Sequence, residues 1–243
     1  MLGWVADLAY PTACVHCDAF CDGSGPLCGG CDAKLRELSM AAACGQCALP
    51  VAQVGAPCPR CLGKGLYPYE RVGRLCVYDD PVKSVVKQFK YHRRWPLGEW
   101  LADRLCEQAR TQALLKDVEA IIPVPLHRRR QFARGYNQAK VIAGRIHKKT
   151  RIKIVEALKR PRYTEQQTSL TNQKDRHSNV RDAFALVDAE AIQGKRILVV
   201  DDVLTTGATL QAVGRTLLAA EPAALLALVI SVADPRHRDF LTL

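Results

Sequence analysis

Hydrophobic positions after residue 66 form short apolar runs separated by stripes with helical spacing. The apolar runs predict strands at Leu75–Tyr78, Glu119–Pro125, Ile152–Ala157, Phe184–Val187, Ile197–Val200 and Ala224–Val232. The stripes predict helices that begin at Asp80–Pro81 and that span about Pro96–Leu115, Arg130–Lys148 and Ala208–Ala220. Strands that alternate with helices indicate an α/β fold with a doubly wound, mainly parallel sheet.

The predicted strand Ile197–Val200 leads into the polar segment with the clearest chemical signal. Two carboxylates follow the strand, then a Thr-Thr-Gly turn, and a helix begins near Ala208. Hydroxyls and N–H groups at a helix N-terminus favour a phosphate. Paired carboxylates can accept from sugar hydroxyls or bind magnesium. The residues of this predicted phosphate and sugar site are Asp201, Asp202, Thr205, Thr206, Gly207, Ala208 and Thr209.

Other functions of the same segment have to be considered. Acids after a strand can cap the next helix, and Thr-Gly turns are common in loops. A response-regulator receiver also places acids at strand ends, but its acidic pair lies near the start of the domain. A Walker-type phosphate loop is excluded because no lysine follows Gly207.

Cysteines dominate the N-terminal quarter of the chain. Eight of the eleven form four Cys-x-x-Cys pairs, and the arrangement repeats after thirty residues. Two such pairs supply the four thiolates of a closed tetrahedral zinc site. The predicted ligands are Cys14, Cys17, Cys28, Cys31, Cys44, Cys47, Cys58 and Cys61. Residues 14–61 are therefore predicted to be a double zinc ribbon with two structural zinc ions.

The repeat favours sequential pairing of the four cysteine pairs, although crossed pairing would use the same ligands. His16 and Cys21 are spare donors near the first site, whereas Cys76 and Cys106 fit apolar core positions. The expected domains are residues 1–66, an N-terminal helix with the double ribbon, and residues 67–243, the α/β domain.

Composition and charge limit the cellular location and the ligands that can be expected. No run of about 18 apolar residues is present, so no transmembrane helix is expected. The N-terminus lacks the basic start of a signal peptide, and the zinc-ligand spacing fits a reducing cytoplasm. The net charge is +11, to which residues 1–66 contribute −1. The basic α/β domain could attract nucleotides or a nucleic-acid backbone, or be an ordinary solvated surface.

Further segments follow the pattern of one family. They are Ile122–Leu126, Arg134–Gln138 and a series made up of Arg162, Thr164, Gln167, Leu170, Arg176, Asn179, Ala183 and Phe184. With the cysteine pairs and the Asp-Asp-x-x-Thr-Thr-Gly motif, the chain resembles the ComF family over nearly its entire length. The resemblance implies a type I phosphoribosyltransferase fold behind a double zinc ribbon. Family members of the competence type are implicated in natural transformation.

The resemblance also implies a ligand, phosphoribosyl pyrophosphate (PRPP) with magnesium. The acidic pair would bind the ribose hydroxyls and the loop that ends at Thr209 would bind the 5′-phosphate. Residues 160–180 match the mobile lid of type I enzymes. Candidate contacts to pyrophosphate or within the lid are Pro125, Leu126, Arg134, Arg162 and Arg176.

The sequence leaves three hypotheses open. The first is a phosphoribosyltransferase with an unidentified acceptor and unassigned catalytic residues. The second is a non-catalytic module that binds single-stranded DNA through the clusters Lys87–Trp95 and His127–Arg134, where cations alternate with aromatics. The third is a scaffold whose ribbon docks a helicase-like partner of the DNA-uptake machinery. No insertion into a membrane is expected in any of them.

Overall fold

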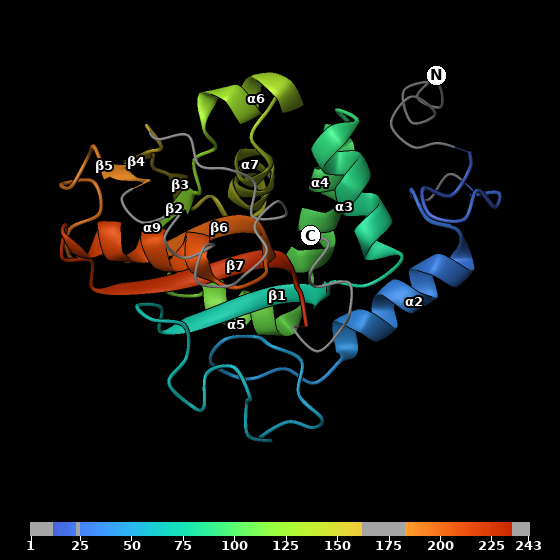
Figure 1. The fold of residues 1–243 in the computed structure, drawn as a ribbon, viewed down its shortest axis with the longest axis horizontal. Coiled ribbons are helices and arrows are strands. Elements are labelled where there is room, and N and C mark those ends of the chain that lie inside the picture. Colours follow the sequence, from blue (N-terminus) through green and yellow to red (C-terminus); the bar gives the residue numbers. More distant parts are fainter. Residues whose placement is uncertain (1–11, 23–24, 162–182, 235–243) are drawn as a thin grey trace.

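The computed structural model describes residues 12–22, 25–161 and 183–234 (Figure 1). In these residues a five-stranded sheet has the order β1-β7-β6-β2-β3, and every neighbouring pair is parallel. Its strands are β1 (Arg71–Val77), β7 (Ala224–Val232), β6 (Arg196–Leu204), β2 (Ala120–Pro123) and β3 (Lys153–Ile154). The predicted parallel α/β sheet is confirmed.

Both faces of the sheet are buried. Leu198 and Val200 of β6 enter one apolar cluster, and the alternating residues Ile197 and Val199 enter the other. The first face is covered by α3 (Val82–Tyr91), α4 (Trp95–Cys106), α5 (Ala109–Leu115) and α7 (Gln138–Thr150). Residues of α9 (Ala208–Leu218) pack on the second face. Helices on both faces confirm the doubly wound arrangement.

Two predicted helices are each broken in two. Helix α4 ends at Cys106 and α5 begins at Ala109, whereas one helix was expected over Pro96–Leu115. The helix expected over Arg130–Lys148 is α6 (Arg128–Arg134) followed by α7. Gly135 has a φ of 84°, which ends α6, and the side chain of Asn137 caps α7.

Several predicted strands also differ from those observed. β1 begins at Arg71, ahead of the expected Leu75, because its polar N-terminal half pairs with β7. Only Lys153–Ile154 of the segment Ile152–Ala157 joins the sheet. The segment Phe184–Val187 lies outside the main sheet, where β5 (Ala185–Leu186) pairs antiparallel with β4 (Leu158–Lys159).

Several expectations fall outside the described residues. They include the N-terminal helix, the lid beyond residue 161, and the candidate contacts Arg162 and Arg176. Within the described ranges, no helix combines the length and apolar character needed to cross a bilayer.

The cysteine-rich region packs against both faces of the sheet beside the edge strand β1. Leu27 and Leu35, the latter on α2 (Gly29–Met40), join the first apolar cluster. Leu49 and Leu66 join the second. The N–H of Val72 donates to the carbonyl of Gln46 at 2.9 Å. The ribbon thereby covers an edge that would otherwise expose unpaired backbone groups (Figure 1).

A buried arginine fixes this arrangement. Arg74 on β1 is 1% exposed, and its guanidinium donates to the carbonyls of Ala48 at 2.6 Å, Ala41 at 3.1 Å and Ala42 at 3.4 Å. Burial lowers the pKa of Arg74 to about 10, so the group keeps its charge at neutral pH. A charged donor shared by three carbonyls stabilises the contact between sheet and ribbon.

Replacing Arg74 should therefore loosen this contact. We expect Arg74→Met to lower the free energy of unfolding by about 3 kcal/mol, because it leaves buried carbonyls without their donor. Arg71→Met removes an exposed arginine from the same strand and is the matched control. Urea titration of the zinc-loaded proteins measures both, and equal losses would contradict the role given to Arg74.

Candidate functional site

Eight cysteines form two clusters in the described part of the chain. Cys14, Cys17, Cys28 and Cys31 make the first, and Cys44, Cys47, Cys58 and Cys61 make the second. Pairing is therefore sequential, as the repeat predicted. The Sγ atoms of Cys17 and Cys28 are 3.6 Å apart, and those of Cys47 and Cys58 are 3.5 Å apart. Tetrahedral zinc with Zn–S bonds of about 2.3 Å places sulfurs about 3.8 Å apart, so both donor sets fit structural zinc.

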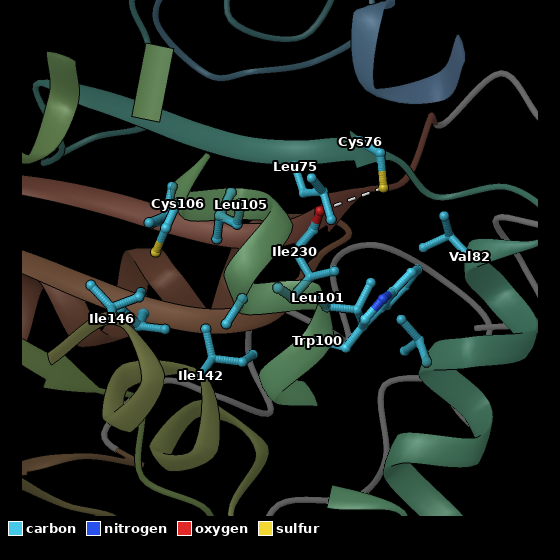
Figure 2. Close-up of a cluster of buried hydrophobic side chains, with 14 of the residues drawn as sticks. Leu75, Cys76, Val82, Trp100, Leu101, Leu105, Cys106, Ile142, Ile146 and Ile230 are labelled. Carbon is cyan, nitrogen blue, oxygen red and sulfur yellow. Dashed lines mark hydrogen bonds between the residues drawn. The ribbon is translucent and has the colours of Figure 1, made fainter. Parts of the chain in front are cut away.

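The remaining cysteines and the spare histidine have other surroundings. His16 contacts Ser84 at 2.9 Å, and the Cys21 thiol donates to the carbonyl of Ala19. Cys76 and Cys106 are buried in the first apolar cluster, as predicted (Figure 2). Burial raises the pKa of the Cys76 thiol to about 12 and that of Cys106 to about 11, which makes both poor nucleophiles.

A cleft of about 250 Å³ lies beyond the carboxyl ends of β2 and β6. Ligands of doubly wound folds bind at this edge of the sheet. Seven residues predicted from the sequence line the cleft: Pro125, Leu126, Arg134, Asp201, Asp202, Thr205 and Thr209. Thr206, Gly207 and Ala208 shape the turn instead, and Arg162 and Arg176 lie outside the described residues. Gly207 has a φ of 87°, and the N–H of Ala208 donates to Thr206 Oγ1 at 3.3 Å.

The acidic pair lies within β6, whereas the strand was expected to end at Val200. Backbone pairing with β7 continues through Asp201 to Leu204, so the strand extends to the mouth of the cleft. Lys90 forms an ion pair with Asp202 at 3.0 Å, and the N–H of Asp202 donates to Asp201 Oδ1 at 2.8 Å. The two carboxylates therefore have different partners.

Of the two carboxyls, Asp201 is the one whose ionised form is disfavoured. Burial and the neighbouring charge of Asp202 raise the pKa of its carboxyl to about 7, although Lys90 and Arg160 favour the ionised form. A hydroxyl donor or a cation supplied by a ligand would stabilise the ionised Asp201.

Cations outnumber acids on the walls of the cleft. Lys87, Lys90, Arg130, Arg134 and Arg160 face two aspartates. Arg134 donates to Gln138 Oε1 at 3.1 Å, which turns the buried Nε2 of Gln138 away from that arginine. The balance favours an anionic ligand rich in oxygen acceptors.

Some of these residues were missed in the sequence. The ion pair of Lys90 with Asp202 and the lining residues Tyr78 and Gln138 were not singled out. Lys87 and Lys90 lie three positions apart and so share a face of α3, which is the one signal that could have found this contact. No sequence pattern places Tyr78 at the cleft.

Comparisons with known proteins agree with this architecture. Residues 5–62 match the double zinc ribbon domain, and residues 136–240 match the phosphoribosyl transferase domain. Competence protein F of Haemophilus influenzae is 31% identical over 210 residues, which cover 84% of this chain and 90% of that protein. The chain belongs to the Competence protein F family.

The present chain also matches other proteins. DNA utilization protein YhgH of Escherichia coli (strain K12) is 32% identical over 72% of this chain and 77% of that protein. A solved structure, glutamine PRPP amidotransferase from B. subtilis, is 22% identical with a TM-score of 0.34. The match covers 57% of the present chain and 26% of that larger protein.

The raised pKa of Asp201 gives a prediction for the stability of this chain. The pKa of Asp201 lies near 4 in an unfolded chain and near 7 in the fold. The folded state therefore binds the proton more tightly, and stability falls as pH rises from about 4 to about 7. Asp201→Asn should raise the Tm of ligand-free protein by roughly 2–5 °C at pH 8, with a smaller gain at pH 5.

Asp117→Asn is the matched control, because it neutralises an exposed acid outside the cleft and should give no such gain. Thermal unfolding followed by circular dichroism at both pH values measures the difference. An equal gain in Tm for the two variants, or a gain in Tm that is independent of pH, would show that ionised Asp201 does not destabilise the fold.

Proposed function

We propose that this chain binds PRPP, or a phosphoribosyl nucleotide, with magnesium in the cleft. One observation carries the proposal: the acidic pair and two threonines of the Thr205–Thr209 loop line a single cleft with five cations. Sugar hydroxyls need the carboxylate acceptors, and phosphates need the cations and donors. PRPP carries both kinds of group on one ribose.

Each part of the cleft suits one part of that ligand. The loop at the start of α9 would hold the 5′-phosphate with its hydroxyls and N–H groups. Asp201 and Asp202 would accept from the ribose hydroxyls, which would favour the ionised form of Asp201. Pro125, Leu126 and Arg134 would lie beside the pyrophosphate. The carboxylates are oxygen donors of the type that magnesium prefers, so the donor set fits this ion.

A transferase reaction follows from the same placement. The bond from the anomeric carbon to pyrophosphate breaks, a bond to an acceptor nitrogen forms, and that nitrogen loses a proton. Positive charge on the ribose ring would be stabilised by the acidic pair. Arg134 and Lys90 would stabilise the departing anion. Magnesium, when bound, would neutralise part of the pyrophosphate charge.

Single-stranded DNA is a second candidate ligand. The two basic and aromatic clusters of the sequence meet in space: the Arg134 guanidinium lies 5.1 Å from the ring centroid of Tyr91, and the Tyr136 hydroxyl donates to the carbonyl of Phe89. Tyr91 is 53% exposed and Phe132 on α6 is 88% exposed. Exposed rings among cations can stack bases and contact phosphates, and one relative is named a DNA utilization protein.

The ribbon supports the third function, docking of a helicase-like partner. Its exposed apolar side chains are Phe20, Met40, Val54 and Leu62. Exposed apolar side chains of this kind are available to contact a partner protein.

Eight zinc-ligating thiols suit a reducing compartment, and we propose the cytoplasm.

Binding of PRPP is tested by calorimetric titration of the zinc-loaded protein with PRPP and magnesium. We expect binding in the intact protein and at least a hundredfold loss, roughly, in Asp201→Asn/Asp202→Asn, because two charged acceptors are removed. Asp117→Asn/Glu190→Gln removes two exposed acids and is the matched control. Absence of heat in the intact protein would count against a PRPP site.

Binding of DNA is tested by fluorescence anisotropy with a labelled single strand at low and moderate salt. Tyr91→Ala/Phe132→Ala should weaken binding about tenfold through lost stacking, and affinity should fall as salt rises. Leu62→Ala/Val54→Ala, in exposed positions of the ribbon, is the control pair. Equal affinity in the aromatic variant would contradict a stacking surface.

A further inference from the structure

Arg60 connects the second zinc site with the loop of the cleft. It lies between the ligands Cys58 and Cys61. Its Nη2 donates to the carbonyl of Thr205 at 2.8 Å and to the carbonyl of Ala233 at 3.2 Å. One guanidinium from the ribbon therefore holds the segments that follow β6 and β7.

Two further contacts join the segment after the ribbon to the same loop. Gly207 is so close to Leu66 that a Cβ at this glycine would be 2.7 Å from Leu66 Cδ1. The Tyr69 hydroxyl donates to the carbonyl of Leu210 at 2.7 Å. The segment that leaves the ribbon thus packs against the turn and first helical residues of the loop. The back of the loop is held by the ribbon, while Thr205 and Thr209 face the cleft.

The position of Arg60 depends on the metal site. Backbone N–H groups of Leu62 and Lys64 donate to the carbonyls of Cys58 and Cys61, which makes a tight turn around the arginine. Zinc holds both ends of this turn, and a ribbon without its metal loses the constraint that fixes it. The first zinc site contacts the opposite apolar cluster, so it offers a comparison of identical chemistry.

We propose that Arg60 is a positioning residue that couples zinc retention at the second site to phosphate binding by the Thr205–Thr209 loop. The proposal rests on the phosphoribosyl function above. If zinc at this site favours the loop geometry that binds phosphate, a bound phosphate ligand must favour zinc at this site by the same factor. The first site, which lacks this link, should gain nothing.

The test measures how fast each site loses zinc to a zinc-selective chelator in the presence of a thiol-alkylating reagent. Peptide mapping separates Cys14–Cys31 from Cys44–Cys61, so each site has its own rate. Saturating PRPP with magnesium should slow alkylation of the second site about tenfold and leave the first site unchanged. Equal protection of both sites, or of neither, would overturn the coupling.

Variants then identify the residue that carries the coupling. Arg60→Gln should retain two zinc ions, bind PRPP about tenfold more weakly and lose the selective protection, since its shorter, uncharged side chain does not reach both carbonyls. Arg60→Lys should recover part of the affinity. Lys64→Ala removes an exposed cation of the same ribbon and should behave as the intact protein. Unchanged protection in Arg60→Gln would overturn the role of Arg60.

Hydrogen exchange of the ligand-free protein separates this proposal from the function on which it rests. Amides of residues 203–209 should exchange several-fold faster in Arg60→Gln than in the intact protein. If the intact protein binds no PRPP and this difference appears, the function fails and the link to the loop stands. The opposite outcome is that PRPP binds but Arg60→Gln changes neither the amide exchange, the protection of the second zinc site nor the affinity for PRPP. In that case the function stands and the link fails.

Discussion

Burial of the guanidinium of Arg74 is the interaction on which the rest of the fold depends. The ribbon is held by its cysteine sites and by a small number of apolar contacts to the α/β domain. The edge strand β1, in turn, needs a cover for its backbone groups. Arg74 holds the ribbon at this edge, because it projects from the strand and donates to three ribbon carbonyls. The sheet and the ribbon consequently behave as one packed body, in which each apolar face contains residues of both.

This packing explains why the zinc ribbon lies beside the cleft. The second ribbon and the segment after it pack behind the loop at the start of α9, and the cleft opens in front of this loop. Phosphate-binding loops need fixed N–H groups, and a glycine such as Gly207, at a φ of 87°, gives the backbone more conformational freedom to lose. Neighbouring side chains must therefore supply the rigidity, and here the ribbon supplies them.

The sequence was informative where one local rule decides the outcome. Four cysteine pairs gave both zinc sites and their pairing, and the segment Ala224–Val232, which is apolar except at Ser231, gave β7 with its bounds. It was less informative where a distant contact decides. The strand was expected to begin only at Leu75, because the partners of Arg74 lie in the ribbon, and the stripe across Gly135 hid a left-handed turn. The length of β6 beyond Val200 depends on pairing with β7, which no local pattern records.

The same limit applies to function, since a fold of this kind supports several chemistries and the site must decide among them. Arg134 belongs to both candidate sites: it lines the cleft and also stacks on the exposed ring of Tyr91. One guanidinium has a fixed set of donors, and in the ligand-free protein one of them is given to Gln138. A pyrophosphate in the cleft and a DNA phosphate on the outer surface would draw on the remaining donors of this one residue. If both ligands bind, they are therefore expected to compete or to be ordered in time, so the two functions are linked through a single side chain.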